Sequence, residues 1–184
     1  MLSGLNRWLL KALGWQMEIG EWPFPPKYIV IVVPHTSNWD FPLGLMVRSA
    51  LDVDIKYVGK ESLFRGPLGR IFRWLGGYPV DRSKNTNFVD LVADIFNRHE
   101  TFAIAIAPEG TRSKVDKLKT GFYYIARAAG VPIIMCRFDW SRKKVAFSKP
   151  FYTTDDADAD FEAIYDFFRG AIGKIPENSF LLET

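Results

Sequence analysis

Short apolar runs and amphipathic stripes alternate along this chain. Continuous apolar runs of the kind found in strands buried on both faces occupy residues 28–33 and 102–107, and a further strand is expected at 131–138. Shorter strands are expected at 55–58 and 144–147, and apolar positions at helical spacing predict helices at 42–50, 63–75, 88–96, 120–129 and 161–172. This alternation predicts an α/β fold, a single domain whose largely parallel or mixed central sheet is flanked by helices.

The N-terminal segment has a pattern of its own. Leucines at positions 2, 5, 9 and 13 recur at helical spacing, with Arg7 and Lys11 to the side. We expect residues 1–22 to form an amphipathic helix and its lead-in, and residues 23–184 to form the main domain, because a proline-rich stretch separates them. Two interpretations of this helix stay open: it packs on the protein's own core, or it lies in a membrane interface.

The composition fits one folded domain in a reducing compartment. Of the 184 residues, 48% are apolar and 15% aromatic, which excludes intrinsic disorder and suffices for one sizeable core. The single cysteine, Cys136, excludes an intramolecular disulfide and falls in an apolar strand pattern, so we interpret it as a small buried side chain. The longest uncharged stretch, residues 28–39, is far shorter than the about 20 apolar residues of a membrane-spanning helix. We therefore expect a cytoplasmic protein that does not span a bilayer.

Charge is unevenly distributed along the chain. Residues 1–149 carry 22 basic and 13 acidic side chains, whereas residues 150–184 carry 2 and 8, so the net charge of +3 conceals a basic body and an acidic tail. A basic body favours anionic partners such as phosphate, nucleic acid or an acidic bilayer. The acidic run of Asp156, Asp158 and Asp160 is interpreted as a solvated lead-in to the last helix.

His35 and Asp40 directly follow the strand at 28–33, where functional residues of α/β sheets gather. On a regular helix, residues five apart point about 140° away from each other, so this pair meets only across a turn. A carboxylate bound to one imidazole nitrogen makes the other nitrogen a general base. The alternative is a loop histidine without a catalytic role; the second histidine, His99, is interpreted as structural.

A second polar cluster, Glu109-Gly110-Thr111-Arg112, follows the strand at 102–107. Glycine allows close backbone approach, and hydroxyl and guanidinium groups donate to phosphate oxygens, so the loop is suited to hold an anion. The lysines at 114, 117 and 119 are interpreted as a solvated face. Arg82, at the end of a short extended piece, would add a further cationic anchor.

At these residues the chain resembles the glycerolipid acyltransferase family typified by 1-acylglycerol-3-phosphate O-acyltransferase. The resemblance runs in order from about residue 28 to residue 135. It consists of His-x4-Asp at His35 and Asp40, a Gly-x-x-x-Asp-Arg block ending at Arg82, Glu-Gly-Thr-Arg at residues 109–112, and Val-Pro-Ile-Ile at residues 131–134. Lys60 is similar to a lysine that the family tends to have ahead of its second block. Pro34 departs from the asparagine that many members have before the histidine.

The resemblance implies a glycerol-3-phosphate acyltransferase-like fold and an acyl transfer without a metal or other cofactor. His35 would remove the proton from an acceptor hydroxyl, which then attacks the thioester of acyl-CoA or an acyl-carrier protein as co-substrate, and Asp40 would orient His35. Arg82 and Arg112 would hold the substrate's phosphate, with Lys60 assisting. The substrate-binding loop would be shaped by Glu109, Gly110 and Thr111. The acceptor would be a lysophospholipid such as 1-acylglycerol-3-phosphate, and the enzyme would be peripheral on the inner face of the cell membrane.

Two alternatives share most of these features. One is a catalytically silent module that binds phospholipid or phosphate at the membrane surface, and the other is an acyltransferase for an amino-lipid or glycolipid acceptor. Hydrolysis by a serine nucleophile lacks its usual G-x-S-x-G turn. Nucleic-acid binding would need basic and aromatic residues on one strand face, which these apolar strands do not offer.

Overall fold

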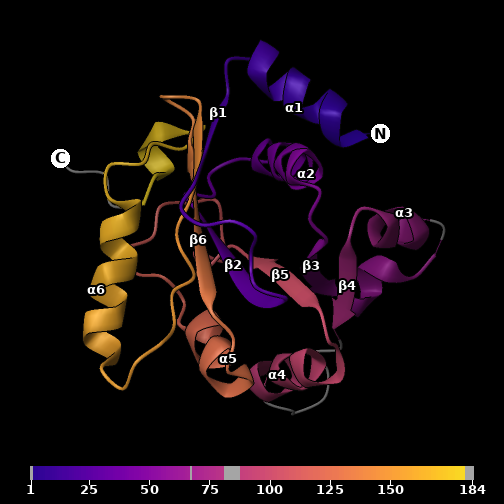
Figure 1. Cartoon of the computed structure of the whole chain (residues 1–184), viewed down its shortest axis with the longest axis vertical. Helices are drawn as coiled ribbons and strands as arrows, with labels where there is room; N and C mark the ends of the chain where they lie inside the picture. Colours follow the sequence, from indigo (N-terminus) through magenta and orange to yellow (C-terminus); the bar gives the residue numbers. More distant parts are fainter. Residues whose placement is uncertain (1, 67, 81–87, 181–184) are drawn as a thin grey trace.

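One mixed sheet forms the centre of the protein. Within residues 2–66, 68–80 and 88–180, which the computed structural model describes, seven strands are ordered β1-β7-β6-β2-β5-β3-β4 (Figure 1). The strands are β1 Gln16–Ile19, β2 Lys27–Val33, β3 Ile55–Lys60, β4 Gly77–Val80, β5 Phe102–Ile106, β6 Ile133–Asp139 and β7 Lys144–Phe147. All neighbours pair in parallel except β6 and β7, which form an antiparallel hairpin. The expected α/β fold with a mixed sheet is confirmed.

Helices cover both faces of the sheet. They are α1 Leu2–Ala12, α2 Asp40–Leu51, α3 Leu68–Trp74, α4 Phe88–Arg98, α5 Gly121–Ala129 and α6 Ala157–Phe168, with 3-10 turns η1 Glu61–Phe64 and η2 Pro176–Asn178. Alternate residues of β2 point to opposite faces: Ile29 and Ile31 pack with the buried residues of α4, α5 and α6, whereas Tyr28 and Val30 pack with those of α1 and α2. Figure 1 shows these two layers, with α3 beyond the edge strand β4.

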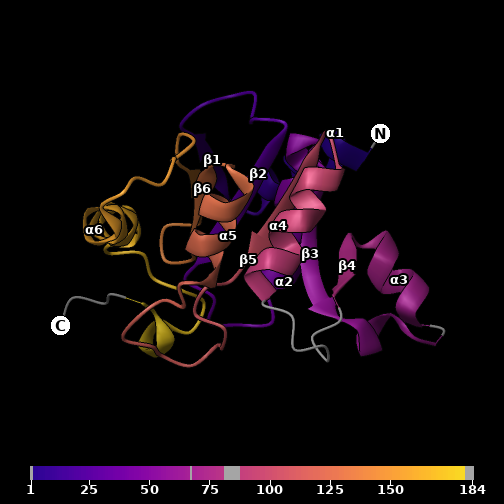
Figure 2. The ribbon, with the colours of Figure 1, turned by 90° about the horizontal axis from the view of Figure 1, so that it is seen from below.

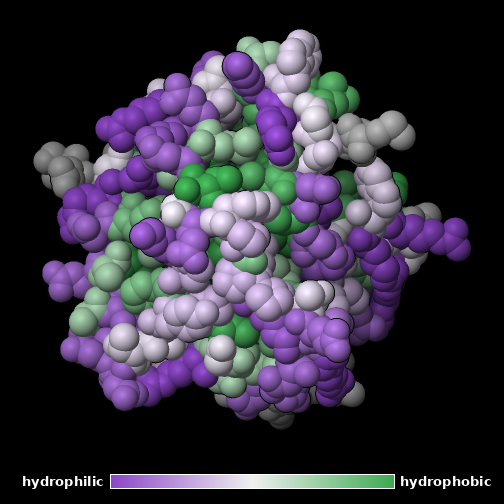
Figure 3. Space-filling model, in the orientation of Figure 1, coloured by the Kyte–Doolittle hydropathy of each residue, from purple (hydrophilic) through white to green (hydrophobic). Residues whose placement is uncertain are grey.

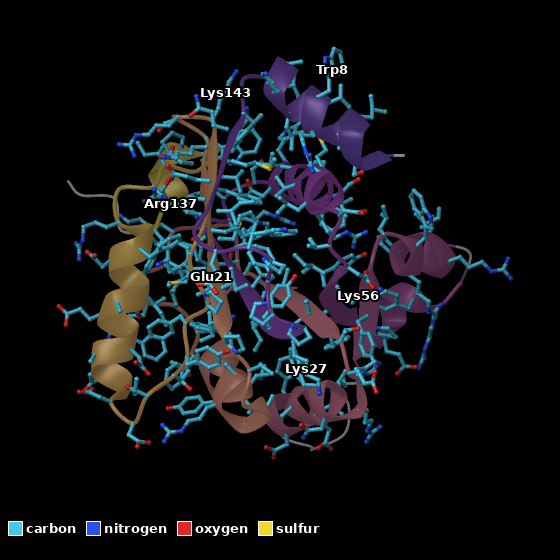
Figure 4. The ribbon with its side chains drawn as sticks, in the orientation of Figure 1. Trp8, Glu21, Lys27, Lys56, Arg137 and Lys143 are labelled. Carbon is cyan, nitrogen blue, oxygen red and sulfur yellow. The ribbon has the colours of Figure 1, made fainter. Side chains whose placement is uncertain are left out.

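Helix α1 packs on α2 with one side and leaves the other side open. Leu10 is buried in the core, and Asn6 Nδ2 donates a 2.8 Å hydrogen bond to Ser49 Oγ of α2. Leu5 and Trp8 of α1 and Leu13, directly after the helix, are exposed, and Trp8 points outward in Figure 4. The helix therefore packs on the core, and its outer side remains apolar.

Three local predictions differ from the structure. The helix expected at 63–75 is interrupted between η1 and α3, because Gly66 adopts a φ of +76° that a right-handed helix excludes. The last helix begins at Ala157 and ends at Phe168, earlier than expected. Strand β1 was not expected; it has only four residues, and its extended form depends on pairing with β7.

The acidic run at the start of α6 is only partly solvated. Asp156 caps the helix, because its side chain accepts a hydrogen bond from Ala159 N at 3.0 Å. Asp160, however, is buried and accepts hydrogen bonds from Tyr123 Oη at 2.8 Å and Thr154 N at 2.6 Å. The solvated interpretation was wrong for Asp160, which joins α6 to α5.

The parallel strands bring distant loops to one edge of the sheet. β2 pairs with β5 on one side and β6 on the other, all in parallel, so their carboxyl ends lie together. Figure 2 shows the loops that follow β2 and β5, together with the segment after α6, along the lower edge of the molecule. The two polar clusters singled out in the sequence therefore meet at this edge.

Candidate active site

His35 and Asp40 occupy the turn between β2 and α2. Asp40 is the first residue of α2, so the intervening residues cross a turn rather than a helix. His35 Nδ1 lies 3.1 Å from Asp40 Oδ2, with the imidazole partly exposed and the carboxylate buried. Because this contact uses Nδ1, the other ring nitrogen, Nε2, is the one left for a substrate.

Donors from two parts of the chain orient Asp40. Its Oδ2 accepts hydrogen bonds from the backbone N–H groups of Thr36 and Ser37, each at 2.9 Å. Its Oδ1 accepts a hydrogen bond from the indole Nε1 of Trp140 at 2.7 Å. An ionised carboxylate only accepts, so Asp40 holds the neutral imidazole of His35 in the tautomer that carries its proton on Nδ1.

Glu109 lies against the same turn. Its carboxylate is buried, and Oε2 accepts a hydrogen bond from the backbone N–H of His35 at 2.6 Å. Burial raises the pKa of Glu109 from 4.5 to about 7, and the N–H of His35 acts in the opposite direction. Glu109 therefore connects the loop after β5 to the histidine turn.

The rest of the predicted anion loop is exposed beside Glu109. Gly110 has a φ of +67°, a conformation that favours glycine. Thr111 and Arg112 are exposed, and within the described residues no hydrogen bond or ion pair joins either side chain to His35 or Asp40. The loop thus presents its hydroxyl and guanidinium groups to solvent next to the histidine turn.

Lys119 adds a cation to this loop. Its backbone N–H donates to Pro108 O at 2.8 Å, and its side chain lies against Gly110, where a Cβ atom would collide with it. The side chain is exposed, as expected for a solvated lysine, but its place over the loop was not anticipated. The φ of position 110 favours glycine, whereas the exposed, flexible side chain of Lys119 could move aside for a Cβ.

The structure leaves two predicted substrate contacts untested. Lys60 is the last residue of β3, where its backbone pairs with Val80 of β4, and only its backbone is described. Arg82 lies outside the described residues. Both remain predictions of the resemblance.

Trp140 is a site residue that the sequence interpretation missed. It directly follows β6, in the turn that leads to β7. The backbone N–H of Trp140 donates to Ile172 O at 2.8 Å. The indole ring meets Trp15 edge-on with centroids 5.0 Å apart, and Lys174 Nζ lies 4.8 Å from its ring centroid. These contacts hold the indole in place for its hydrogen bond to Asp40.

The segment after α6 packs on the histidine turn. Ile175 N donates to the hydroxyl of Thr36 at 3.1 Å, and Thr36 is almost fully buried. A Cβ at Gly173 would collide with the side chain of Thr36, so only glycine permits this approach. The acidic tail region thus includes a segment that supports the site, which its charge pattern did not predict.

An apolar cavity of about 280 Å³ opens beside His35 and Asp40. It runs between α2 and the sheet, and its walls are made largely of apolar side chains: Val30, Val32, Leu45, Val47, Leu51, Ile55, Val58, Ile106, Cys136, Phe138 and Phe147. Phe41, Arg48 and Tyr57 also line it. Such a cavity suits an extended hydrocarbon chain whose polar end lies at the histidine.

A second cavity, of about 360 Å³, lies at the amino ends of the strands, on the face shown in Figures 3 and 4. Hydrophilic residues cover much of the rim of this face (Figure 3), and Lys27 and Lys56 mark the starts of β2 and β3 (Figure 4). His99 lines this cavity; its ring stacks on Phe102, and Nδ1 lies 2.8 Å from Ile95 O. These contacts agree with a structural role for His99.

Comparisons with known proteins show which family the chain is similar to. The family model described as Acyltransferase matches residues 20–139, more than half of the chain. The 1-acyl-sn-glycerol-3-phosphate acyltransferase of Escherichia coli K12 is 33% identical over 111 residues, 57% of this chain and 44% of the relative. The beta form from Homo sapiens is 31% identical over 130 residues, 68% of this chain and 46% of the relative. The chain thus spans less than half the length of either curated relative.

A solved structure shares the fold. The 1-acyl-sn-glycerophosphate (LPA) acyltransferase PlsC of Thermotoga maritima superposes with a TM-score of 0.56 at 20% identity, covering 89% of this chain and 75% of that one. Among the described residues, no helix combines the length and hydropathy needed to cross a membrane. The match of the family model over most of the chain, on the same fold, shows that this chain belongs to the acyltransferase family.

Proposed function

We propose that this protein transfers a fatty acyl group from an acyl thioester to the hydroxyl of a lysophospholipid such as 1-acylglycerol-3-phosphate, in phospholipid biosynthesis. The donor is acyl-CoA or acyl-carrier protein. The observation that carries the proposal is the 3.1 Å contact between His35 Nδ1 and Asp40 Oδ2 beside an apolar cavity. The names of the curated relatives support the choice of acceptor.

In the proposed reaction, His35 Nε2 takes the proton from the acceptor hydroxyl. The hydroxyl oxygen attacks the thioester carbonyl carbon, and the tetrahedral intermediate breaks its C–S bond to release the thiolate. The thiolate takes the proton from His35, which returns to its neutral form. Asp40 keeps Nδ1 protonated and compensates the positive charge that His35 carries during the transfer.

The acceptor's phosphate would lie against the exposed loop that follows β5. Arg112 offers a planar fork of donors, and Lys119 places a second cation over Gly110. Lys60 and Arg82 are the further contacts that the family resemblance implies. The fatty chain would occupy the apolar cavity, which ends beside His35.

We place the protein at the membrane surface, peripheral on its cytoplasmic face, because its substrates are lipids. The exposed Leu5, Trp8 and Leu13 on the outer side of α1 offer one apolar contact with the interface. The basic body of the chain favours anionic headgroups and an acidic acyl carrier.

The test is an assay of purified protein with acyl-CoA and with acyl-carrier protein against a panel of acceptors. The panel includes 1-acylglycerol-3-phosphate, other lysophospholipids, an amino-lipid and a glycolipid. The proposal predicts thiol release and a diacyl product with a lysophospholipid. Product only with an amino-lipid or glycolipid would assign the other acceptor class, and binding of lysophospholipid without thiol release would indicate a silent binding module.

A further inference from the structure

Helix α3 stands beyond the edge strand β4 and projects from the body of the protein in both ribbon views (Figures 1 and 2). Its inner side is close to η1: Gly69 is buried, and a Cβ there would collide with the backbone of Phe64. Its outer side exposes Leu68 by 60%, Ile71 by 52% and Trp74 by 77%. Residues three apart on a helix differ by about 60° in direction, so these side chains form one stripe about 120° wide.

The segment around this apolar stripe is basic, and one arginine lies exposed beside it. Residues 61–75 contain three arginines, at positions 65, 70 and 73, and a single acid, Glu61. Arg65 pairs with Glu61 at 3.1 Å, and Arg73 Nη1 donates to Phe64 O at 3.0 Å. Arg70 is exposed on the side of the stripe. Apolar side chains next to an exposed arginine, in a segment of net positive charge, are typical of a surface that binds an anionic membrane interface.

The helix is also connected to residues that line the cavity beside His35. Tyr57 Oη donates to Phe72 O of α3 at 3.2 Å, and the ring of Tyr57 meets Phe41 edge-on with centroids 5.2 Å apart. Arg48 Nη1 donates to Leu75 O, directly after α3, at 3.0 Å. Phe41, Arg48 and Tyr57 all line the cavity. Helix α3 is therefore joined to one wall of the cavity, and a surface on which α3 rests lies close to that wall.

A bilayer fits this stripe better than a folded protein does. A stable protein interface buries about 800 Å² on each partner around a packed centre. The stripe has only three apolar side chains, on a helix of seven residues that projects from the body (Figure 2). Fluid lipid tails can pack around separate apolar side chains, and tryptophan and arginine side chains are favourable in the membrane interface.

We propose that α3 docks on an anionic bilayer, inserting Leu68, Ile71 and Trp74 among the lipids while Arg70 contacts headgroup phosphates. This docking brings the cavity wall that is joined to α3 close to the membrane, which shortens the path of a lipid chain from the bilayer to the cavity. The docking surface is separate from the outer side of α1. The delivery of a lipid chain to the cavity rests on the proposed function, whereas the binding of α3 to the bilayer does not.

The first test measures binding of the full chain to vesicles of phosphatidylcholine, alone or mixed with phosphatidylglycerol. Replacing Leu68, Ile71 and Trp74 together by serine is expected to weaken binding to the mixed vesicles about tenfold or more. Arg70→Gln, which is exposed and far less disruptive, is expected to weaken binding about fivefold on mixed vesicles and hardly at all on neutral ones. A matched control replaces Tyr124 and Tyr152, exposed by 49% and 61%, by serine and should bind as the parent does.

A second variant set separates the two helices. If serine at Leu5, Trp8 and Leu13 of α1 abolishes binding while the α3 variant and Arg70→Gln bind like the parent, the proposal is overturned. Unchanged vesicle binding together with a partner protein bound through Arg70 would overturn it in favour of a protein interface.

The final test separates docking from chemistry. The α3 variant is expected to lose turnover with acceptor embedded in vesicles and to keep it with acceptor dispersed in detergent. Equal turnover of variant and parent on vesicles contradicts the role of α3 at the cavity. Absence of turnover by the parent in both formats, with vesicle binding retained, counts against the proposed function and leaves the docking surface standing.

Discussion

The indole Nε1 of Trp140 donates a 2.7 Å hydrogen bond to Oδ1 of Asp40 across 100 residues of sequence. The other oxygen of Asp40 contacts His35 Nδ1 and two backbone N–H groups. Trp140 therefore fixes the rotation of the carboxylate that orients the proposed base. It acts as a positioning residue, since its own contact is with Asp40.

Replacing Trp140 by phenylalanine tests this relationship. Phenylalanine keeps an aromatic ring against Trp15 but has no N–H donor, so Asp40 loses one of its four contacts. A hydrogen bond to a charged group contributes about 1.5–3 kcal/mol, so kcat is expected to fall between about tenfold and a hundredfold. KM for the acyl acceptor should stay near its parent value, because Trp140 takes no part in the proposed phosphate contacts.

The matched control is Trp15→Phe, which changes the packing around Trp140 and leaves the indole N–H of Trp140 in place. It should keep most of the parent kcat, even where thermal unfolding shows a comparable loss of stability. Equal losses of kcat in both variants would show that Trp140 acts through packing and not through its hydrogen bond to Asp40.

Glu109 should make stability depend on pH. Burial raises its pKa from 4.5 to about 7, so between these values the folded protein keeps a proton that the unfolded chain has released. The free energy of unfolding of the parent therefore falls as pH rises through this window. Glu109→Gln lacks this titration, so relative to the parent it should gain up to about 3 kcal/mol between the acid and alkaline ends of the window.

Urea denaturation at a series of pH values measures this difference. Glu100→Gln, at an exposed position, provides the control and should follow the parent at every pH. A difference between Glu109→Gln and the parent that stays constant from acid to alkaline pH would contradict the raised pKa.

Asp160 should matter for stability and not for chemistry. It is buried and accepts hydrogen bonds from Tyr123 Oη and from Thr154 N and Oγ1, far from His35 in the sequence and on the α5–α6 side of the sheet. Asp160→Ala leaves these donors without their partner, at a cost of about 3 kcal/mol in the free energy of unfolding. Asp158→Ala, exposed two residues earlier, should cost less than about 0.5 kcal/mol. Similar urea midpoints for the two variants would show that the buried network is not stabilising.

Gly44 offers a way to shorten the cavity. It lies in α2 on the cavity wall, and a Cβ there would have its nearest neighbour, Phe138 Cζ, 3.8 Å away. There is therefore room for the Cβ of a leucine at position 44, and the rest of that side chain would extend into the cavity. We expect kcat/KM for long-chain thioesters to fall at least about tenfold relative to short-chain ones. A uniform loss over all chain lengths would show that the acyl chain lies elsewhere; Gly121→Leu, at an open position of α5, is the control.

The pattern of apolar residues predicted the strands that carry the site. The runs at 28–33 and 102–107 match β2 and β5 to within one residue, because strands buried on both faces are continuous in apolar residues. The polar residues directly after those strands then had to lie at one edge of the sheet. This reasoning placed His35 and Glu109 near each other, and their 2.6 Å contact agrees with it.

The same rule, applied to β6, would have selected Trp140, the first residue after that strand. A tryptophan carries no charge and matches no catalytic pattern, so the sequence alone does not indicate Trp140 as a site residue. The hydrogen bond of Trp140 to Asp40 depends on the conformation of the turn between β6 and β7. In that turn the buried Asp139 accepts hydrogen bonds from Ser141 Oγ and Arg142 N. No local pattern encodes that arrangement.

Tertiary contacts also explain the remaining differences. The packing of Ile175 and Gly173 on Thr36 joins residues more than a hundred positions apart, and nothing in the acidic composition of the tail indicates it. In the sequence, Asp160 cannot be distinguished from the neighbouring surface acids. Its burial depends on α5, which provides Tyr123 as its hydrogen-bond donor. Elements with strong periodicity were predictable, whereas contacts made by single polar side chains across the sheet were not.

The rate of thiol release by His35→Ala tests the central claim most directly. Purified parent and variant are incubated with an acyl thioester and 1-acylglycerol-3-phosphate in detergent, and the thiol and the diacyl product are measured together. With His35 as the general base, the variant should lose at least about a hundredfold in kcat while its fold and acceptor binding are retained. A variant that turns over at the parent rate would contradict the assignment of the base and with it the proposed mechanism.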